Sequence, residues 1–126
     1  MIVIDVGNTN IVIGIYLKNK LNKVFRINTE KNKKKFKLFF ENFLKSHQLI
    51  FKTEKKICVL SSVVPQINSL IKNIFLKNKF NFFIIDPKKV SKNIKINYKL
   101  SQIGYDRVAN FVAVHNKKIS NSIIVD

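Results

Sequence analysis

Cysteine, proline and glycine are scarce in this chain of 126 residues, and tryptophan is absent. The single cysteine excludes a disulfide within the chain, and because Cys58 stands in an apolar run we expect a buried thiol in a reducing compartment. With only two prolines, three glycines and 46% hydrophobic residues, the composition argues against a disordered or low-complexity chain. The length predicts a single folded domain.

Long hydrophobic runs are also missing. No apolar stretch approaches the length that a membrane-spanning helix needs. The first apolar run is interrupted by Asp5 before a signal-peptide core could form, and no basic leader precedes it. We therefore expect a cytoplasmic protein that has no membrane partner.

Acidic residues are few, with 7 carboxylates against 24 basic residues and a formal net charge of +17. Such an excess ordinarily suggests an anionic partner. Only Arg26 and Arg107 are arginines, and the lysines are spread over nearly every segment instead of gathering in a patch. Because reading of phosphates and bases favours arginine, we expect no specific nucleic-acid partner. A basic nucleic-acid-binding protein remains a less favoured alternative.

The apolar residues predict three antiparallel strands at the start of the chain. Residues 1–5 and 11–16 are apolar runs separated by a turn-rich group, which predicts a β-hairpin. A second turn at residues 18–20 leads to residues 24–29, which alternate apolar and polar like a half-exposed strand.

Helical and extended patterns alternate in the rest of the chain. We expect a helix from Lys33 with a phenylalanine-rich face, a strand at 57–64, a helix that begins at Pro65, and a strand at 80–86. The predicted elements that follow are an extended segment at 94–100, a helix at 108–114 and a buried strand at 122–126. This order resembles the α/β ribonuclease-H-like domain of actin, sugar kinases and acetate kinases.

The first group with chemical potential lies where the first strand turns into the second. Gly7 lets the backbone approach phosphate oxygens, and Asn8 and Thr9 offer uncharged donors. Asp5 can hold a hydrated magnesium ion beside a phosphoryl group. The competing interpretation is a plain hairpin turn, which explains the glycine and asparagine but leaves a carboxylate in an apolar strand unexplained.

The second group is Gly104, Tyr105, Asp106 and Arg107, at the start of a predicted helix. Asp106 is either a helix cap or the group that accepts the proton of an attacking hydroxyl. Arg107 is either a solvated neighbour or the partner of an anionic substrate. The third group is Asp126 alone, a carboxylate that closes a buried strand and for which a metal ion is one suitable partner.

These groups, with Ser62, Val63, Val64 and Pro65 between them, resemble type III pantothenate kinases in identity, order and spacing from residue 2 to 126. The resemblance implies ATP-dependent phosphorylation of pantothenate, the first step of coenzyme A synthesis, in a homodimer that uses magnesium and a monovalent cation, potassium or ammonium.

The resemblance also implies roles for particular residues. Asp106 would be the proton acceptor, Asp126 would bind the monovalent cation, and Asp5 would hold magnesium through water. The remaining implied positions fall into two sets. The ATP-phosphate loop would comprise Asp5, Val6, Gly7, Asn8, Thr9, Asn10, Ile11 and Val12. The pantothenate site would comprise Tyr98, Gly104, Tyr105, Asp106 and Arg107.

The sequence departs from the family in its length. The family continues after Asp126 into a second ATP-gripping loop and a second lobe, so we expect residues 1–126 to be one amino-terminal lobe that is inactive alone. A separately encoded carboxy-terminal lobe is a possible partner. The alternative is a non-catalytic nucleotide-binding or regulatory remnant of the same fold. The mechanism further requires that the carboxylates at positions 5, 106 and 126 meet at one edge of the sheet.

Overall fold

The computed structural model describes residues 1–30, 32–53, 55–86, 104–118 and 123. These residues belong to two units, Met1–Phe83 and Ile84–Asp126, and each unit is described by itself. The predicted extended segment at 94–100 and the predicted strand at 122–126 lie outside the described residues, apart from Ile123.

The first unit opens with three strands, β1 (Ile2–Val6), β2 (Asn10–Leu17) and β3 (Lys20–Asn28). Both β1 with β2 and β2 with β3 pair antiparallel, which confirms the predicted opening of the domain. The turn between β2 and β3 has positive φ angles at Lys18 and Asn19, 47° and 64°. Two successive residues of this kind match the twist of a tight hairpin.

Two further strands complete a sheet of five, in the order β3-β2-β1-β4-β5. Strand β4 (Ile57–Ser62) pairs with β1 in parallel, and β5 (Asn81–Ile84) lies beyond it at the edge. The connection from β1 to its parallel partner β4 runs through β2, β3 and the helical residues 33–46, which gives it the length that a parallel pairing requires. The fold of this unit is therefore mixed α/β, as predicted.

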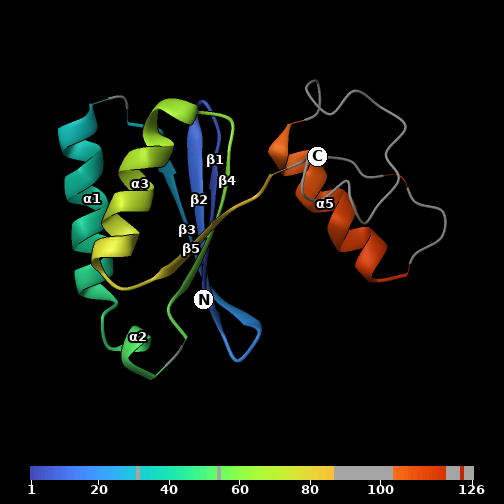
Figure 1. Cartoon of the computed structure of the whole chain (residues 1–126), viewed down its shortest axis with the longest axis horizontal. Helices are drawn as coiled ribbons and strands as arrows, with labels where there is room; N and C mark the ends of the chain where they lie inside the picture. The colour runs from blue at the N-terminus through green and yellow to red at the C-terminus, as the bar shows by residue number, and fades with distance from the viewer. Residues whose placement is uncertain (31, 54, 87–103, 119–122, 124–126) are drawn as a thin grey trace. The chain divides into compact units, whose positions relative to one another are not determined.

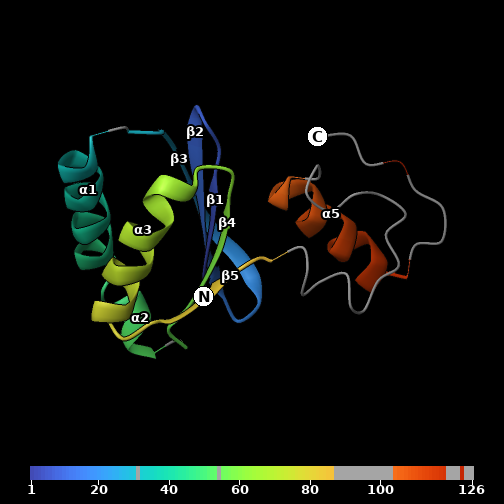
Figure 2. The same ribbon diagram turned by 45° about the horizontal axis from the view of Figure 1, so that its top comes forward.

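Three helices belong to the first unit, α1 (Lys33–Ser46), α2 (Ile50–Thr53) and α3 (Pro65–Lys77). Helix α1 begins after Asn32, whose side chain accepts hydrogen bonds from the N–H groups of Lys34 and Lys35. Proline suits the first turn of α3 because a helix needs no hydrogen-bond donor there. Figures 1 and 2 show α1 and α3 side by side over the same face of the sheet.

The core lies between that face and the two long helices. Alternate residues of the central strands point into it, and the helices contribute the phenylalanine and isoleucine faces that the sequence predicts. The largest side chains that are almost fully buried within Met1–Phe83 are Ile2, Ile4, Val6, Ile11, Ile13, Ile15, Phe36, Phe40, Leu60, Ile71 and Phe75.

The structure differs from the predicted elements in several places, among them β3, which begins at Lys20, four residues before the predicted strand 24–29. Helix α2 was not predicted, β5 is shorter than the predicted strand 80–86, and β4 ends at Ser62 although the apolar residues continue to Val64. The N–H of Val64 bonds to the Ser62 side-chain oxygen at 3.1 Å. This local bond turns the chain toward α3 two residues early.

The second unit contains helix α5 (Tyr105–Asn116), which covers and extends the predicted helix at 108–114. Val108 on this helix is buried, at 1% exposed. A search of the described helices found none that is long and apolar enough to cross a membrane.

Candidate functional site

The loop between β1 and β2 is the first predicted site, and its backbone is closely held. The N–H of Gly7 donates to the carbonyl of Asn10 at 2.9 Å, closing the turn. A Cβ at position 7 would stand 3.1 Å from that carbonyl oxygen, so glycine serves a close approach inside the loop. Because this N–H is already bonded, the donors left for a phosphate in this conformation are those of Asn8 and Thr9.

Asn8 and Thr9 are both exposed, and within the described part of the chain their N–H groups have no acceptor. The side chains of Val6 and Ile11 are buried in the core, so these two residues can reach a ligand only through their backbone. The predicted loop therefore presents two free amide donors at its tip, which suits an anion.

Neighbouring segments hold the loop on both sides. The Thr29 hydroxyl donates to the carbonyl of Gly7 at 2.7 Å, and the Thr29 N–H donates to the carbonyl of Thr9 at 2.8 Å. The N–H of Val63, just after β4, donates to the carbonyl of Val6 at 3.0 Å. Thr29 belongs to no recognisable motif, so the sequence alone does not identify it.

Asp5 is exposed between the buried residues Ile4 and Val6, because alternate residues of a strand face opposite sides of the sheet. Its Cα partners are Val12 on β2 and Ser61 on β4. Ser61 is only 5% exposed, and its hydroxyl has no hydrogen-bond partner within the described residues. A carboxylate and an unsatisfied hydroxyl thus occupy neighbouring positions on one face, near the loop.

These residues fit the magnesium ion that the resemblance implies. Magnesium keeps most of its waters and is commonly held by one or two carboxylates together with substrate phosphates. Asp5 supplies one carboxylate, and the Ser61 hydroxyl could bond to a coordinated water. Among the described residues there is no cluster of three or more acidic, histidine or cysteine ligands, so a metal cage built from protein alone is not present there.

The second predicted site begins α5. The N-cap of this helix is Gly104, and no side chain caps it. Asp106 therefore does not act as the cap, although its carboxylate stands in the first turn, where the helix dipole favours negative charge. The carboxylate turns back so far that a Cβ on Gly104 would collide with its Oδ1. Since φ at Gly104 is −61°, any residue can adopt this backbone conformation, and a larger residue here would require the Asp106 carboxylate to move.

The other predicted site residues are only partly placed. Arg107 is exposed on α5. Tyr105 lies in the helix but its side chain is outside the described part, and Tyr98 and Asp126 are outside the described residues altogether. Because Asp5 and Asp106 belong to separately described units, the common cleft for the three carboxylates stays a prediction.

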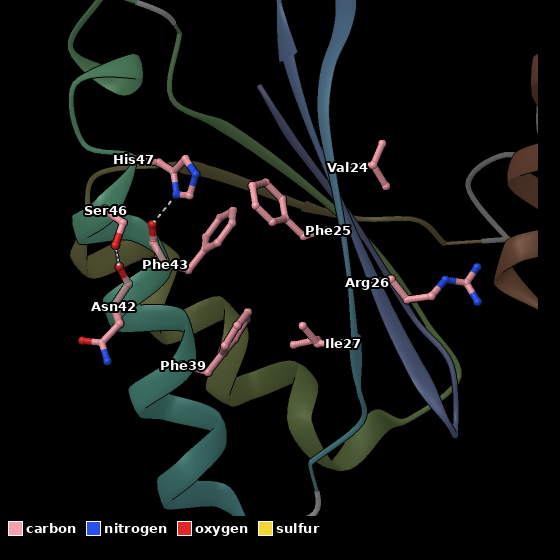
Figure 3. Close-up of a pocket in the computed structure, with 9 residues that line it drawn as sticks. All are labelled: Val24, Phe25, Arg26, Ile27, Phe39, Asn42, Phe43, Ser46 and His47. Carbon is pink, nitrogen blue, oxygen red and sulfur yellow. Dashed lines mark hydrogen bonds between the residues drawn. The ribbon is translucent and has the colours of Figure 1, made fainter.

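A cavity of about 550 Å³ lies between β3 and α1, and none of the predicted site residues lines it. Figure 3 shows Phe25, Phe39 and Phe43 directed toward one another across it, with His47 above, while Val24 and Arg26 point away. Phe25 meets the rings of Phe43 and His47 edge-on, with centroids 5.3 and 5.2 Å apart. The His47 Nδ1 bonds the Phe43 carbonyl at 2.9 Å, so this histidine serves the end of α1.

Cys58 provides no nucleophile. It is fully buried on β4, and burial raises the pKa of its thiol well above the ordinary range. The side chain therefore remains a protonated, apolar part of the core, as the sequence predicts.

Comparison with known proteins agrees with the motifs. The family model described as type III pantothenate kinase matches residues 1–126. A type III pantothenate kinase of Citrifermentans bemidjiense is 32% identical over 133 residues, and one of Desulforapulum autotrophicum is 35% identical over 132 residues. Another, of Brevibacillus brevis, is 33% identical over 132 residues.

Each alignment includes 100% of this chain but 49–50% of the relative. The chain thus spans about half the length of the curated relatives it matches. The match includes both predicted sites, the loop after β1 and the start of α5. This chain belongs to the type III pantothenate kinase family.

Proposed function

We propose that this chain is the amino-terminal lobe of an ATP-dependent kinase that phosphorylates the primary hydroxyl of pantothenate, the first step of coenzyme A synthesis. The observation that carries the proposal is the loop after β1, which holds its own backbone firmly and leaves the Asn8 and Thr9 amides without acceptors among the described residues. Phosphoryl transfer depends mainly on positioning and charge stabilisation, and preset donors supply both.

The fold supports the same proposal. Three antiparallel strands, with β4 added in parallel beside β1, form the arrangement expected of a ribonuclease-H-like domain. By resemblance to type III pantothenate kinases, the loop after the first strand would meet the ATP phosphates. We therefore assign residues 5–12 to ATP, with Asp5 holding magnesium through water. Magnesium would neutralise charge on the phosphates when it is bound.

Asp106 is the proposed proton acceptor for the pantothenate hydroxyl. Its carboxylate stands in the first turn of α5 and is not used as a cap, so it is available to orient a hydroxyl and take its proton. Arg107, exposed on the next position, would pair with the carboxylate of pantothenate. Gly104, Tyr105 and Tyr98 complete the proposed substrate site by family resemblance.

The remaining assignments also follow the family. Asp126 would bind a potassium or ammonium ion, and the complete protein would be a cytoplasmic homodimer. The relatives are about twice as long as this chain, so catalysis would require a carboxy-terminal lobe, either continuous with this chain or separately encoded.

A chimera tests the proposal and the role of Asp106 together. Residues 1–126 would replace the matching half of the Brevibacillus brevis relative, and transfer of labelled phosphate from ATP to pantothenate would be measured. We expect the chimera to be active and the 126-residue chain alone to be inactive. Asp106→Asn should reduce turnover by roughly 10²- to 10⁴-fold while leaving the fold intact, because it removes the proton acceptor and keeps the shape.

Glu41→Gln is the matched control. Glu41 is an exposed helical carboxylate that forms an ion pair with Lys37 at 3.7 Å, so the change should leave turnover unaltered. An inactive chimera, under conditions in which the intact relative works, would contradict the proposed function. Unchanged turnover of the Asp106→Asn chimera would contradict only the role of that residue.

A further inference from the structure

We infer that Thr29 is a positioning residue that fixes the direction of the Asn8 amide donor in the phosphate loop. The inference rests on the proposed function, and it concerns a residue that no motif identifies. Thr29 follows the last residue of β3 and lies 22 positions from Gly7 in sequence. Thr29 has two hydrogen-bond donors, and both bond to the loop. Its hydroxyl donates to the Gly7 carbonyl, and its backbone N–H donates to the Thr9 carbonyl.

The planarity of the peptide bond gives these contacts their effect. The carbonyl of Gly7 and the N–H of Asn8 belong to one peptide unit and point in opposite directions when the unit is trans. No cis peptide bond occurs in the described chain. When the Thr29 hydroxyl holds the Gly7 carbonyl at 2.7 Å, it therefore directs the Asn8 N–H away from β3, toward the exposed side of the loop.

Two other peptide units of the loop are also held by hydrogen bonds, the one between Val6 and Gly7 and the one between Thr9 and Asn10. The unit between Val6 and Gly7 is bonded at both ends, its carbonyl to the Val63 N–H and its own N–H to the Asn10 carbonyl. The carbonyl of Thr9 is held by the Thr29 N–H. Over residues 7–9, the Thr29 hydroxyl makes the one side-chain hydrogen bond found among the described residues, and it acts on the peptide unit that carries the Asn8 donor.

A substitution can remove the Thr29 hydroxyl and keep both the shape of the side chain and the backbone hydrogen bond. Threonine is stiff about χ1, so its hydroxyl is held toward Gly7 without much loss of freedom. Thr29→Val keeps the shape and the backbone N–H bond to Thr9 but leaves the Gly7 carbonyl without its donor. Thr29→Ser keeps the hydroxyl. The pair therefore separates the hydrogen bond from the packing of the side chain.

The first experiment uses the full 126-residue chain and magnesium tripolyphosphate as the probe. Binding would be followed by amide NMR shifts of Asn8 and Thr9 at physiological salt, so that the loop is distinguished from the many lysines. We expect Thr29→Val to weaken the binding reported by these two amides about tenfold, the loss expected when a part-buried carbonyl goes unsatisfied. Thr29→Ser should restore it to near the original value.

The second experiment measures steady-state kinetics in the chimera. Thr29→Val should raise KM for ATP several-fold and leave KM for pantothenate unchanged, a split that general destabilisation does not produce. Ser46→Ala is the matched control, because the Ser46 hydroxyl also donates to a backbone carbonyl, that of Asn42 at 2.9 Å, but on α1. It should change neither KM.

The outcomes separate this inference from the proposed function. Equal binding by the original chain and Thr29→Val, or no response of the two loop amides to the probe, would overturn the role of Thr29. So would an equal rise in both KM values. If the loop amides respond as expected but the chimera does not phosphorylate pantothenate, the positioning role stands and the proposed reaction falls. If Thr29→Val fails to fold, weak binding by a folded Thr29→Ala chain with rescue by Thr29→Ser supports the inference, and binding unchanged in Thr29→Ala overturns it.

Discussion

At the scale of single residues, Gly104 is informative because its role does not depend on the backbone freedom of glycine. A glycine before a helix is usually explained by its backbone freedom, but φ at Gly104 is one that any residue adopts. The constraint is that a Cβ would occupy the space taken by the Asp106 carboxylate. Glycine at this position therefore permits the conformation in which the Asp106 carboxylate rests.

Gly104→Ala should consequently affect catalysis more than stability. Alanine tolerates this backbone conformation, and it restricts the unfolded chain, so the free energy of unfolding should change by less than about 1 kcal/mol. The Asp106 carboxylate must rotate away, and we expect turnover of the chimera to fall about tenfold or more. Urea unfolding and the kinase assay would be compared. A stability loss without a loss of turnover would show that the contact is merely structural.

The sequence could predict some of these residues and not others. Asp5 was identifiable because a carboxylate in an apolar strand needs a reason, and the structure shows it exposed between buried neighbours. Thr29 was not identifiable, because its bonds connect segments that only the pairing of β2 with β3 brings together. The unsatisfied Ser61 hydroxyl depends likewise on the pairing of β4 with β1.

At the scale of elements, hydrophobic periodicity predicted both long helices because their buried faces are regular. The first two strands were predicted from apolar runs on either side of a turn, and the third was predicted from two-residue alternation. The apolar pattern missed α2, since one turn of helix is too short for a period to show, and it extended β4 to Val64. The Ser62 side chain competes with the sheet for the backbone N–H of Val64, and the pattern of apolar residues cannot reveal such a bond.

Helix α1 offers a direct test of the hydrophobic core between the sheet and the helices. Phe40 is fully buried, and its ring packs against Phe36 and Phe75 at centroid distances of 5.0 and 6.0 Å. Phe40→Ala should lower the free energy of unfolding by about 3–5 kcal/mol through the cavity it leaves. Leu38→Ala, on the same helix but 58% exposed, should change it by less than about 0.5 kcal/mol. Similar urea midpoints for the two variants would disprove the assigned core face.

At the scale of the whole molecule, the described core is unevenly divided along the chain. Every buried hydrophobic residue but one lies between Ile2 and Phe80, and Val108 is the exception among the described residues. The whole five-stranded sheet is likewise formed by residue 84. Folding of the first unit therefore requires few contacts from later in the sequence, even though the proposed reaction requires residues from both units.

A fragment of residues 1–86, which keeps β5 whole, should consequently fold without the rest of the chain. We expect it to unfold cooperatively in urea, with a free energy of unfolding within about 2 kcal/mol of the main transition of the 126-residue chain, because the buried apolar area that drives folding is retained. Circular dichroism and amide NMR dispersion would measure this. The same fragment with Phe40→Ala provides the control and should be largely unfolded. A gradual transition in the unaltered fragment would mean that Met1–Phe83 needs later residues to complete its core.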